Sequence, residues 1–227
     1  MEETIIISLG GSMVVPDKVD TGFLKEFKSL IISHVEKGRK FVIIVGGGKV
    51  CRDYQQAANE VTPASKENLD WIGIASISLN AEMLRVVFND QAFSKVIFDL
   101  SKPFSQEKPV VIGGALEPGH SSDFDAVLAA NTVGAKKIIN LSNIDHVYDS
   151  DPKTNPNAKK LESISWEDYR KIIPSEWTSA GLSTPFDPIA SKLAEESGIE
   201  VAIMNGKPID NLKNYLSGEK FQGTIIS

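Results

Sequence analysis

The chain has 227 residues, of which 41% are hydrophobic and 24% charged, and its formal net charge at pH 7 is −6. This length and composition predict a soluble globular protein, and the negative charge argues against nucleic acid as a partner, because non-specific binding to phosphate backbones needs a basic surface. No apolar run is long enough to predict a membrane span. Cys51 is the only cysteine, and the first residues contain neither a basic region nor a cleavage site, so we expect a reduced, cytoplasmic protein.

Short β-branched runs alternate with helical patterns along the chain. The runs at 4–9, 41–45, 109–112, 137–141 and 200–204 predict buried strands. Between the first two, apolar residues from Phe23 to Val35 recur at three- and four-residue spacing, which predicts an amphipathic helix ended by Gly38. Further helices are expected from Ser122 or Asp123 to Gly134, after Ser165, and from Asp187-Pro188 to Gly198.

This alternation predicts an α/β fold, namely a three-layer αβα sandwich with a mainly parallel central sheet. We find neither an internal repeat nor a low-complexity linker, so a single domain spanning 1–227 is expected. Residues 146–158 are rich in Asp, Pro and Asn and predict a hairpin or excursion outside the main sheet.

Three of the predicted strands end in glycine. Gly10-Gly11-Ser12 follows the first, Gly46-Gly47-Gly48-Lys49 the second, and Gly113-Gly114 the third. The carboxyl ends of parallel strands form the binding crevice of such sheets, and glycine lets backbone N–H groups approach phosphate closely. One Gly-Gly pair is more often a tight turn, but three together predict a site for a chain of phosphates. None of them matches the P-loop or the dinucleotide-binding pattern.

Charged residues near these loops are candidates for phosphate binding. Lys49 and Arg52 lie at an expected helix start, where cations are unfavourable unless an anionic ligand is present. Asp70 is flanked by apolar residues, which favours a specific hydrogen bond such as one to a ribose hydroxyl. Alone, Lys192 would be taken for a surface lysine and Asp123 for a helix cap. The histidines and Cys51 form no metal-ligand cluster or nucleophile–base pair, so no metal site is expected.

With these loops in place, the whole chain resembles the amino acid kinase superfamily and, within it, the archaeal type of uridylate (UMP) kinase. The resemblance rests on motifs in a fixed order: Ser-Leu-Gly-Gly-Ser at 8–12, Gly-Gly-Gly-Lys-Val-Cys-Arg at 46–52, Asp-Trp-Ile-Gly-Ile at 70–74, Leu-Asn-Ala at 79–81, Pro-Gly-His-Ser-Ser-Asp at 118–123, Asn-Ile-Asp-His-Val-Tyr-Asp-Ser-Asp-Pro-Lys at 143–153, Ala-Gly at 180–181 and Phe-Asp-Pro-Ile-Ala-Ser-Lys at 186–192.

The resemblance implies transfer of the γ-phosphoryl group of ATP, with Mg²⁺, onto UMP to give UDP. An acceptor half would span about 1–135 and an ATP-binding half about 136–227. The implied catalytic residues are Lys49, Asp123 and Lys192, where Asp123 organises the cationic groups. The implied UMP-binding residues are Gly47, Gly48, Arg52, Asp70, Ser121 and Ser122, and the implied ATP-binding residues are Gly10, Gly11, Ser12, Asn143, Asp145, Tyr148 and Asp151. The family also implies a homohexamer.

Three positions depart from the family pattern. Ser8 replaces a lysine that many members carry before the first Gly-Gly, and Lys49 is expected to take over its role. Ala115-Leu116-Glu117 replaces a shorter loop containing threonine, which leaves the acceptor base open, and His146 replaces a glycine beside the donor site. Two alternatives therefore remain: another small-molecule kinase of the superfamily, or a noncatalytic nucleotide- or oxyanion-binding protein of the same fold, as in molybdate storage.

Overall fold

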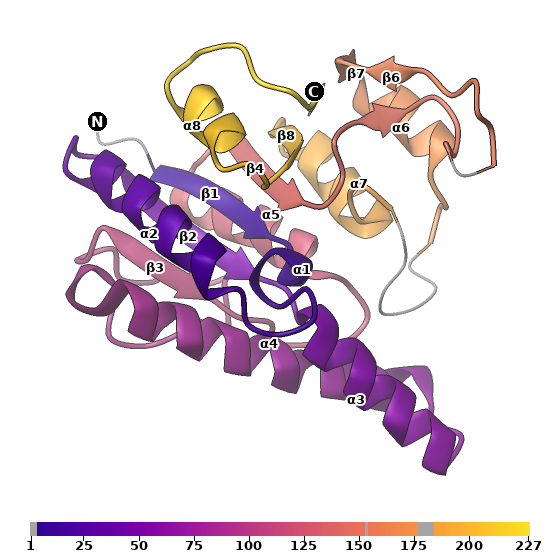
Figure 1. Cartoon of the computed structure of the whole chain (residues 1–227), viewed down its shortest axis with the longest axis horizontal. Coiled ribbons are helices and arrows are strands. Elements are labelled where there is room, and N and C mark those ends of the chain that lie inside the picture. The colour runs from indigo at the N-terminus through magenta and orange to yellow at the C-terminus, as the bar shows by residue number, and fades with distance from the viewer. Residues whose placement is uncertain (1–3, 153, 177–183) are drawn as a thin grey trace.

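A computed structural model describes residues 4–152, 154–176 and 184–227 (Figure 1). Its centre is a seven-stranded sheet with the order β3-β2-β1-β4-β8-β9-β7, in which β8 and β9 pair antiparallel and the other neighbours pair parallel. The strands are β1 (Thr4–Leu9), β2 (Lys40–Val45), β3 (Val110–Gly113), β4 (Lys137–Ser142), β7 (Ser163–Ile164), β8 (Glu200–Asn205) and β9 (Thr224–Ile226). All five strands expected from the sequence are present.

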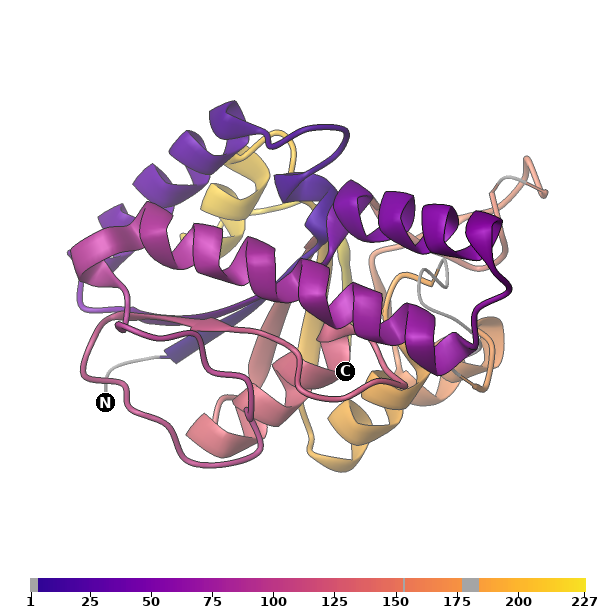
Figure 2. The same cartoon turned by 90° about the horizontal axis from the view of Figure 1, so that it is seen from below.

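Helices cover both faces of this sheet. They are α1 (Gly11–Val14), α2 (Thr21–Val35), α3 (Gly48–Val61), α4 (Lys66–Phe88), α5 (Ser122–Val133), α6 (Trp166–Ile172), α7 (Pro188–Glu196) and α8 (Asp210–Leu216), with a short 3₁₀ turn at Asn89–Gln91. In Figure 2, α2 and α8 lie above the sheet and α5 and α7 lie below it. The expected three-layer αβα sandwich is therefore confirmed.

The two faces of the sheet carry separate hydrophobic clusters because alternate side chains of a strand point to opposite faces. Ile7 and Ile43 belong to the cluster under α2 and α4, whereas their neighbours Ile6 and Ile44 belong to the cluster under α5 and α7. All four side chains are fully buried. This two-sided burial explains why the strands are continuous apolar runs rather than alternating ones.

Local sequence signals fix the ends of several helices. Asp20, Ser65, Ser121, Ser165 and Asp187 each accept a backbone N–H of the helix that follows, as N-cap residues do. Gly134 ends α5 in the left-handed region at φ +74. The predicted excursion at 146–158 begins in β5 (Val147–Tyr148), which pairs antiparallel with β6 (Lys160–Leu161) outside the main sheet.

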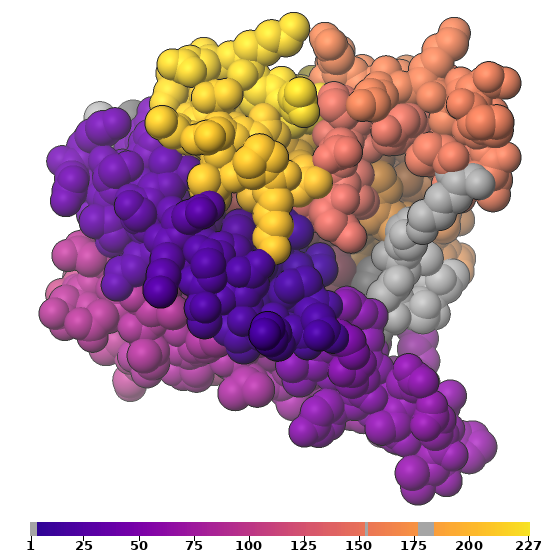
Figure 3. All heavy atoms as spheres, in the orientation of Figure 1, coloured from indigo at the N-terminus to yellow at the C-terminus, as the bar shows by residue number. Residues whose placement is uncertain are grey.

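The helices α3 and α4 form the part of the molecule that projects from the sheet (Figure 3). Residues 66–91 are long and apolar enough to cross a membrane, which the sequence did not suggest. In this fold α4 instead packs on β2, β3 and α3, and it buries Ala81, Leu84 and Phe88 in the core. It also carries the polar or charged residues Asp70, Asn80, Glu82 and Arg85.

Candidate active site

A cavity of about 290 Å³ lies at the carboxyl ends of β1 and β4. Its walls come from the glycine turn after β1, the start of α5, the turn after β4 and the start of α7. Predicted residues that line it are Gly10, Gly11, Ser12, Ser121, Ser122, Asp123 and Asn143. Segments more than 100 residues apart in the sequence thus meet at the sheet edge where ligands bind in parallel α/β folds.

The first two glycine loops are nested against one another. The N–H of Gly46 donates to Leu9 O at 2.9 Å, and the N–H of Gly10 donates to Leu141 O at 2.7 Å. A Cβ on Gly11 would lie 2.6 Å from both the carbonyl carbon and oxygen of Gly46 and would overlap the nitrogen of Gly48. Only glycine fits at position 11. Because Gly11 lines the cavity and packs against the second loop, Gly47 and Gly48 lie directly beside the cavity, although they do not line it.

Asn80 of α4 fixes the second loop. Its Nδ2 donates to Gly46 O at 2.9 Å and to Gly47 O at 3.1 Å, and its side chain is buried. Because Asn80 holds both carbonyl groups, α4 determines the conformation of the second glycine loop. Asn80 belongs to the Leu-Asn-Ala motif, but no local pattern around it predicts this role.

The third glycine pair has a different explanation. Cβ atoms at Gly113 and Gly114 would lie 2.9 Å from Leu100 Cδ1 and 2.8 Å from the Phe98 ring. These glycines make room for the segment that runs parallel to β3, where Ile97 bridges to Gly113, and neither glycine lines the cavity. Of the three glycine loops expected to share one phosphate site, only the first two therefore lie together at the cavity.

Asp123 is the centre of a hydrogen-bond network in the cavity. Its Oδ1 accepts from Ser8 Oγ at 2.7 Å and from Asn140 Nδ2 at 2.8 Å, and its Oδ2 accepts the N–H of Asp187 at 3.2 Å. The protein packed around this carboxylate raises the pKa of Asp123 to about 6; the nearby Asp187 also raises it, while the Ser8 hydrogen bond opposes the shift. Ser8, at the position of the missing lysine, therefore orients the acid rather than a phosphate.

Asp187 joins the beginnings of two helices. Its Oδ1 accepts the N–H groups of Ile189 at 2.6 Å and Ala190 at 3.0 Å, as the cap of α7, and its Oδ2 accepts the N–H of Ser121 at 2.8 Å. Ser121 is in turn the cap of α5. Two helix N-termini therefore meet at the cavity, and their partial positive charges favour an anion there.

Of the other predicted acceptor residues, Asp70 lies on α4 and Arg52 on α3, and neither lines the cavity. Asp70 is buried, and its Oδ2 accepts the N–H of Gly119 at 3.1 Å. Arg52 is exposed on α3. Lys49 Nζ donates to both carboxylate oxygens of Asp53 at 2.7 Å, so its charge is paired on the helix surface. Lys192 is exposed on α7, and neither lysine lines the cavity.

The predicted donor residues continue from the cavity toward a second one. Asn143 lines the first cavity, whereas Asp145 lines a cavity of about 490 Å³ at the carboxyl end of β8 and accepts from Asn205 Nδ2 at 2.8 Å. Tyr148 and Asp151 line neither. His146 is half-buried, and burial lowers the pKa of its imidazole. The motif residues Lys153, Ala180 and Gly181 lie outside the described residues.

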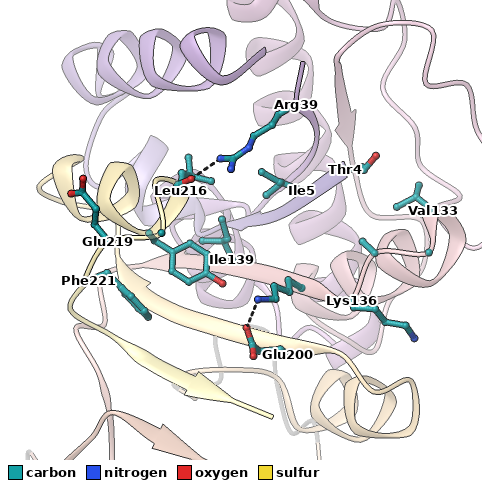
Figure 4. Close-up of a pocket in the computed structure, with 15 residues that line it drawn as sticks. Thr4, Ile5, Arg39, Val133, Lys136, Ile139, Glu200, Leu216, Glu219 and Phe221 are labelled. Carbon is teal, nitrogen blue, oxygen red and sulfur yellow. Dashed lines mark hydrogen bonds and ion pairs between the residues drawn. The ribbon is translucent and has the colours of Figure 1, made fainter. Parts of the chain in front are cut away.

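A further cavity, of about 690 Å³, lies at the opposite, amino-terminal edge of β1, β4 and β8 (Figure 4). Three of its cationic side chains have partners: Arg39 donates to Leu216 O at 2.6 Å, Lys136 donates to Ser197 O at 2.9 Å, and Lys137 Nζ lies 3.4 Å from Glu200 Oε1. None of the predicted site residues lines it. Size alone therefore does not identify the active site of this chain.

Comparison with known proteins agrees with this geometry. The sequence model of the amino acid kinase family matches residues 3–205. The chain belongs to this family. It is 34% identical over 224 residues to the uridylate kinase of Pyrococcus abyssi and 35% identical to that of Thermococcus sibiricus, each time over 98% of both chains.

Solved structures of the family have the same fold. The crystal structure of uridylate kinase from Archaeoglobus fulgidus matches with a TM-score of 0.82 and 33% identity over the full length of both chains. The UMP kinase of Bacillus anthracis, at 21% identity, matches with a TM-score of 0.78 over 99% of this chain and 96% of its own. The expected α/β fold and the resemblance to archaeal uridylate kinases are thus confirmed.

Several site residues were not anticipated from the sequence. Asn80 acts on the site through hydrogen bonds to the second glycine loop, whereas Asn140 and Asp187 line the cavity and also bond to segments far away in the chain. Asp187 had a detectable signal, since Asp-Pro predicted a helix cap. The convergence of two helix caps on one cavity depends on the order of the strands, which the sequence does not state.

Proposed function

We propose that this chain is a uridylate kinase, which transfers the γ-phosphoryl group of ATP to the phosphate of UMP and releases ADP and UDP. The observation that carries the proposal is full-length similarity to uridylate kinases, at about a third identity, in a chain whose nested glycine loops adjoin a cavity with two helix N-termini. The alternatives of another acceptor or of a noncatalytic binding protein are not favoured, since the relatives reported above are uridylate kinases.

The reaction needs positioning and charge stabilisation rather than a general base. An oxygen of the UMP phosphate, already ionised near neutral pH, forms a bond to the γ-phosphorus while the bond from that phosphorus to the β-bridging oxygen breaks, and its electrons remain on ADP. Backbone N–H groups at Gly11 and Ser12 and the start of α5 are placed to meet this charge, whereas the N–H of Gly10 already donates to Leu141 O and those at the start of α7 donate to Asp187.

Lys49 and Lys192 supply mobile positive charge in this proposal. Lys49 would exchange its partner Asp53 for a phosphate, and the exchange is inexpensive because an exposed ion pair of this kind contributes only about 0–1 kcal/mol. Asp123, fixed by Ser8 and Asn140, is placed to organise the groups around the transferring phosphoryl.

On the acceptor side, we assign the UMP phosphate to Arg52 with Gly47, Gly48, Ser121 and Ser122, and the ribose to Asp70. A guanidinium at the surface of the site can hold a phosphate through two parallel hydrogen bonds. A buried carboxylate beside an open site is the usual acceptor for sugar hydroxyls, and the N–H of Gly119 holds that of Asp70 in place.

On the donor side, we assign ATP to residues 10–12 and to Asn143, Asp145, Tyr148 and Asp151. Residues 142–145 connect the two cavities at the carboxyl edge of the sheet, so the γ-phosphate would lie in the first and the nucleoside toward the second. The acceptor half is then about 1–135 and the donor half about 136–227.

Mg²⁺ is expected to enter with ATP. The described residues contain no group of three or more carboxylate, histidine or cysteine side chains that could hold a metal. Both oxygens of Asp123 already accept hydrogen bonds. The described residues therefore do not fit a dedicated metal site.

We further propose a cytoplasmic homohexamer. Supporting this, α4 exposes large apolar side chains along its length, with 47% of Trp71, 62% of Leu79 and 63% of Val86 accessible in the single chain. Such a face is costly to leave in water and suits contact with a second copy. Analytical ultracentrifugation of the full chain tests the assembly.

The experiment that tests the function is ADP release from ATP and Mg²⁺ with a panel of acceptors: UMP, CMP, dUMP, AMP, aspartate, acetylglutamate and isopentenyl phosphate. We expect strong turnover with UMP alone, which would also show that the altered loop at 115–117 retains selection of uracil. Turnover with a different acceptor would change the substrate assignment. ATP binding without turnover of any acceptor would overturn the kinase assignment.

A further inference from the structure

Asp125 is a buried acid that the proposed reaction does not use. It lies on α5, two residues after Asp123, and only 2% of its surface is accessible. Its Oδ2 has no hydrogen-bond partner among the described residues, and burying an unpaired carboxylate is costly. Burial first, and then the charges of Asp123 and Asp187, raise the pKa of Asp125 to about 8. At neutral pH the side chain therefore retains its proton.

The imidazole of His120 lies close to this carboxyl group. Its Nδ1 lies 3.9 Å from Asp125 Oδ2 and 3.2 Å from the carbonyl oxygen of Ser121. A carbonyl can only accept, so Nδ1 carries the proton in that hydrogen bond. The ring also packs on Phe124, with centroids 4.4 Å apart. The N–H at Nδ1 therefore lies between two acceptors, the carbonyl oxygen of Ser121 and the carboxyl group of Asp125. The carboxyl group becomes negatively charged only when Asp125 ionises.

The backbone N–H groups of the residues on either side of His120 donate to two acids of the site. The N–H of Gly119 donates to Asp70, the proposed ribose ligand, and the N–H of Ser121 donates to Asp187, the cap of α7. A shift of the His120 ring thus moves backbone groups that orient the acceptor ligand. A continuous series of contacts therefore leads from Asp125 through His120 and Gly119 to Asp70.

The other charged groups around Asp125 all resist its ionisation. Asp123 on the same helix and Asp187 at the start of α7 both raise its pKa. From α6, the hydroxyl of Tyr169 donates to Phe186 O, and its pKa is itself raised by burial and by Asp123 and Asp187. The strands beneath α5 contribute apolar side chains such as Ile6 and Ile44. Among the described residues, His120 is the group positioned to pair with an ionised Asp125.

We propose that Asp125 is a positioning residue for acceptor binding, which acts through His120 to set the placement of residues 119–121 and hence of Asp70. With Asp125 neutral, the His120 N–H stays on Ser121 O and the loop keeps the geometry described above. With Asp125 ionised, the carboxylate attracts this N–H, and the loop moves away from Asp70. The proposal rests on the proposed function, since it assigns the consequence to UMP binding.

The test measures kcat, the KM for UMP and the KM for ATP across about pH 6.5–9 in the full chain and in Asp125→Asn, which mimics the neutral acid. We expect the KM for UMP of the unaltered chain to rise about three- to tenfold above pH 8, with kcat and the KM for ATP within about twofold. Asp125→Asn should remove this rise. Asp99, a half-buried surface acid, provides the matched control, and Asp99→Asn should retain this rise.

A second readout does not depend on turnover. The chain has three histidines, so their NMR signals can be assigned with single variants, and the His120 signal should show an inflection near pH 8 that Asp125→Asn abolishes. Equal pH profiles in both proteins, or a loss confined to kcat, would overturn the proposal. If the unaltered chain does not turn over UMP, the proposed function fails, while an inflection lost in Asp125→Asn would still establish the pair.

Discussion

Replacing Gly11 by alanine tests whether the nested glycine loops are the structural basis of the site. The added Cβ would lie 2.6 Å from the carbonyl carbon and oxygen of Gly46, whereas real Cβ atoms essentially never approach closer than 3.0 Å. It would also overlap the nitrogen of Gly48. All of these atoms are backbone, so no side chain can rotate away. Relief of the contacts with Gly46 alone requires a separation of about 0.4 Å, and relief of the overlap with Gly48 N requires more.

The cost follows from what holds those loops. Separation strains the Gly46–Leu9 hydrogen bond and the two bonds from Asn80, all of which fix the second loop. Overpacking of this kind typically costs about 1–3 kcal/mol, so we expect a loss of that size in the free energy of unfolding. Because a misplacement of about 1 Å can cost about 100-fold in rate, kcat/KM should fall by up to about 100-fold.

Urea denaturation and steady-state kinetics with ATP and UMP provide both measurements. Gly22→Ala is the matched control: its Cβ would lie 3.4 Å from Asp20 Oδ1, an ordinary contact, within helix α2. There alanine should be neutral or stabilising by about 0.5–1 kcal/mol. Stability and kcat/KM of Gly11→Ala equal to those of the control would refute the close nesting of the two loops.

Three further predictions follow from the charges of the site. Lys192→Ala should lower kcat by about 10- to 100-fold and change the KM for UMP much less, as measured by initial rates against the exposed Lys213→Ala control; an unchanged kcat would exclude Lys192 from the transfer step. The folded chain retains a proton on Asp125 that the unfolded chain loses above its ordinary pKa of 3.8, so between that pH and about pH 8 stability falls as pH rises, by at most about 1.4 kcal/mol per unit. Melting temperatures should therefore show a stabilising effect of Asp125→Asn that grows from pH 5 to pH 8, and a constant difference would contradict the raised pKa. Nucleotide binding near pH 7 should take up protons, since an incoming anion raises the pKa of Asp123 above its value of about 6; calorimetry in buffers of different ionisation enthalpy measures this uptake, and identical apparent enthalpies in all buffers would argue against it.

The sequence was sufficient wherever the signal was local. Continuous apolar runs identified the strands because both faces of the sheet are covered, and Asp187-Pro188 marked the start of α7 because side-chain caps act within three residues. The glycines after β1 and β2 lie at or beside a cavity, as expected for consecutive glycines at the carboxyl ends of parallel strands. In these cases the physical cause and its consequence lie within a few residues of each other.

Prediction failed where the cause lies elsewhere in the chain. Gly113 and Gly114 look like a phosphate loop, but Leu100 and Phe98 pack against them, and no local pattern distinguishes the two explanations. Lys49 seemed to require an anionic ligand at a helix start. The structure provides Asp53 one turn later on the same helix, so this argument alone no longer supports a phosphate contact.

The site brings together acids where a kinase must bind phosphates, and the protonation of these acids resolves the conflict. Asp123, Asp125 and Asp187 lie around the starts of α5 and α7, and three full negative charges there would repel ATP and UMP. Asp187 accepts three backbone N–H groups, which disperse its charge into two helix ends. With pKa values of about 8 for Asp125 and about 6 for Asp123, the former is mostly neutral at pH 7 and the latter becomes neutral more readily as an anion approaches. The acids thus contribute hydrogen bonds that organise the cavity while keeping little of the charge that would oppose the substrates.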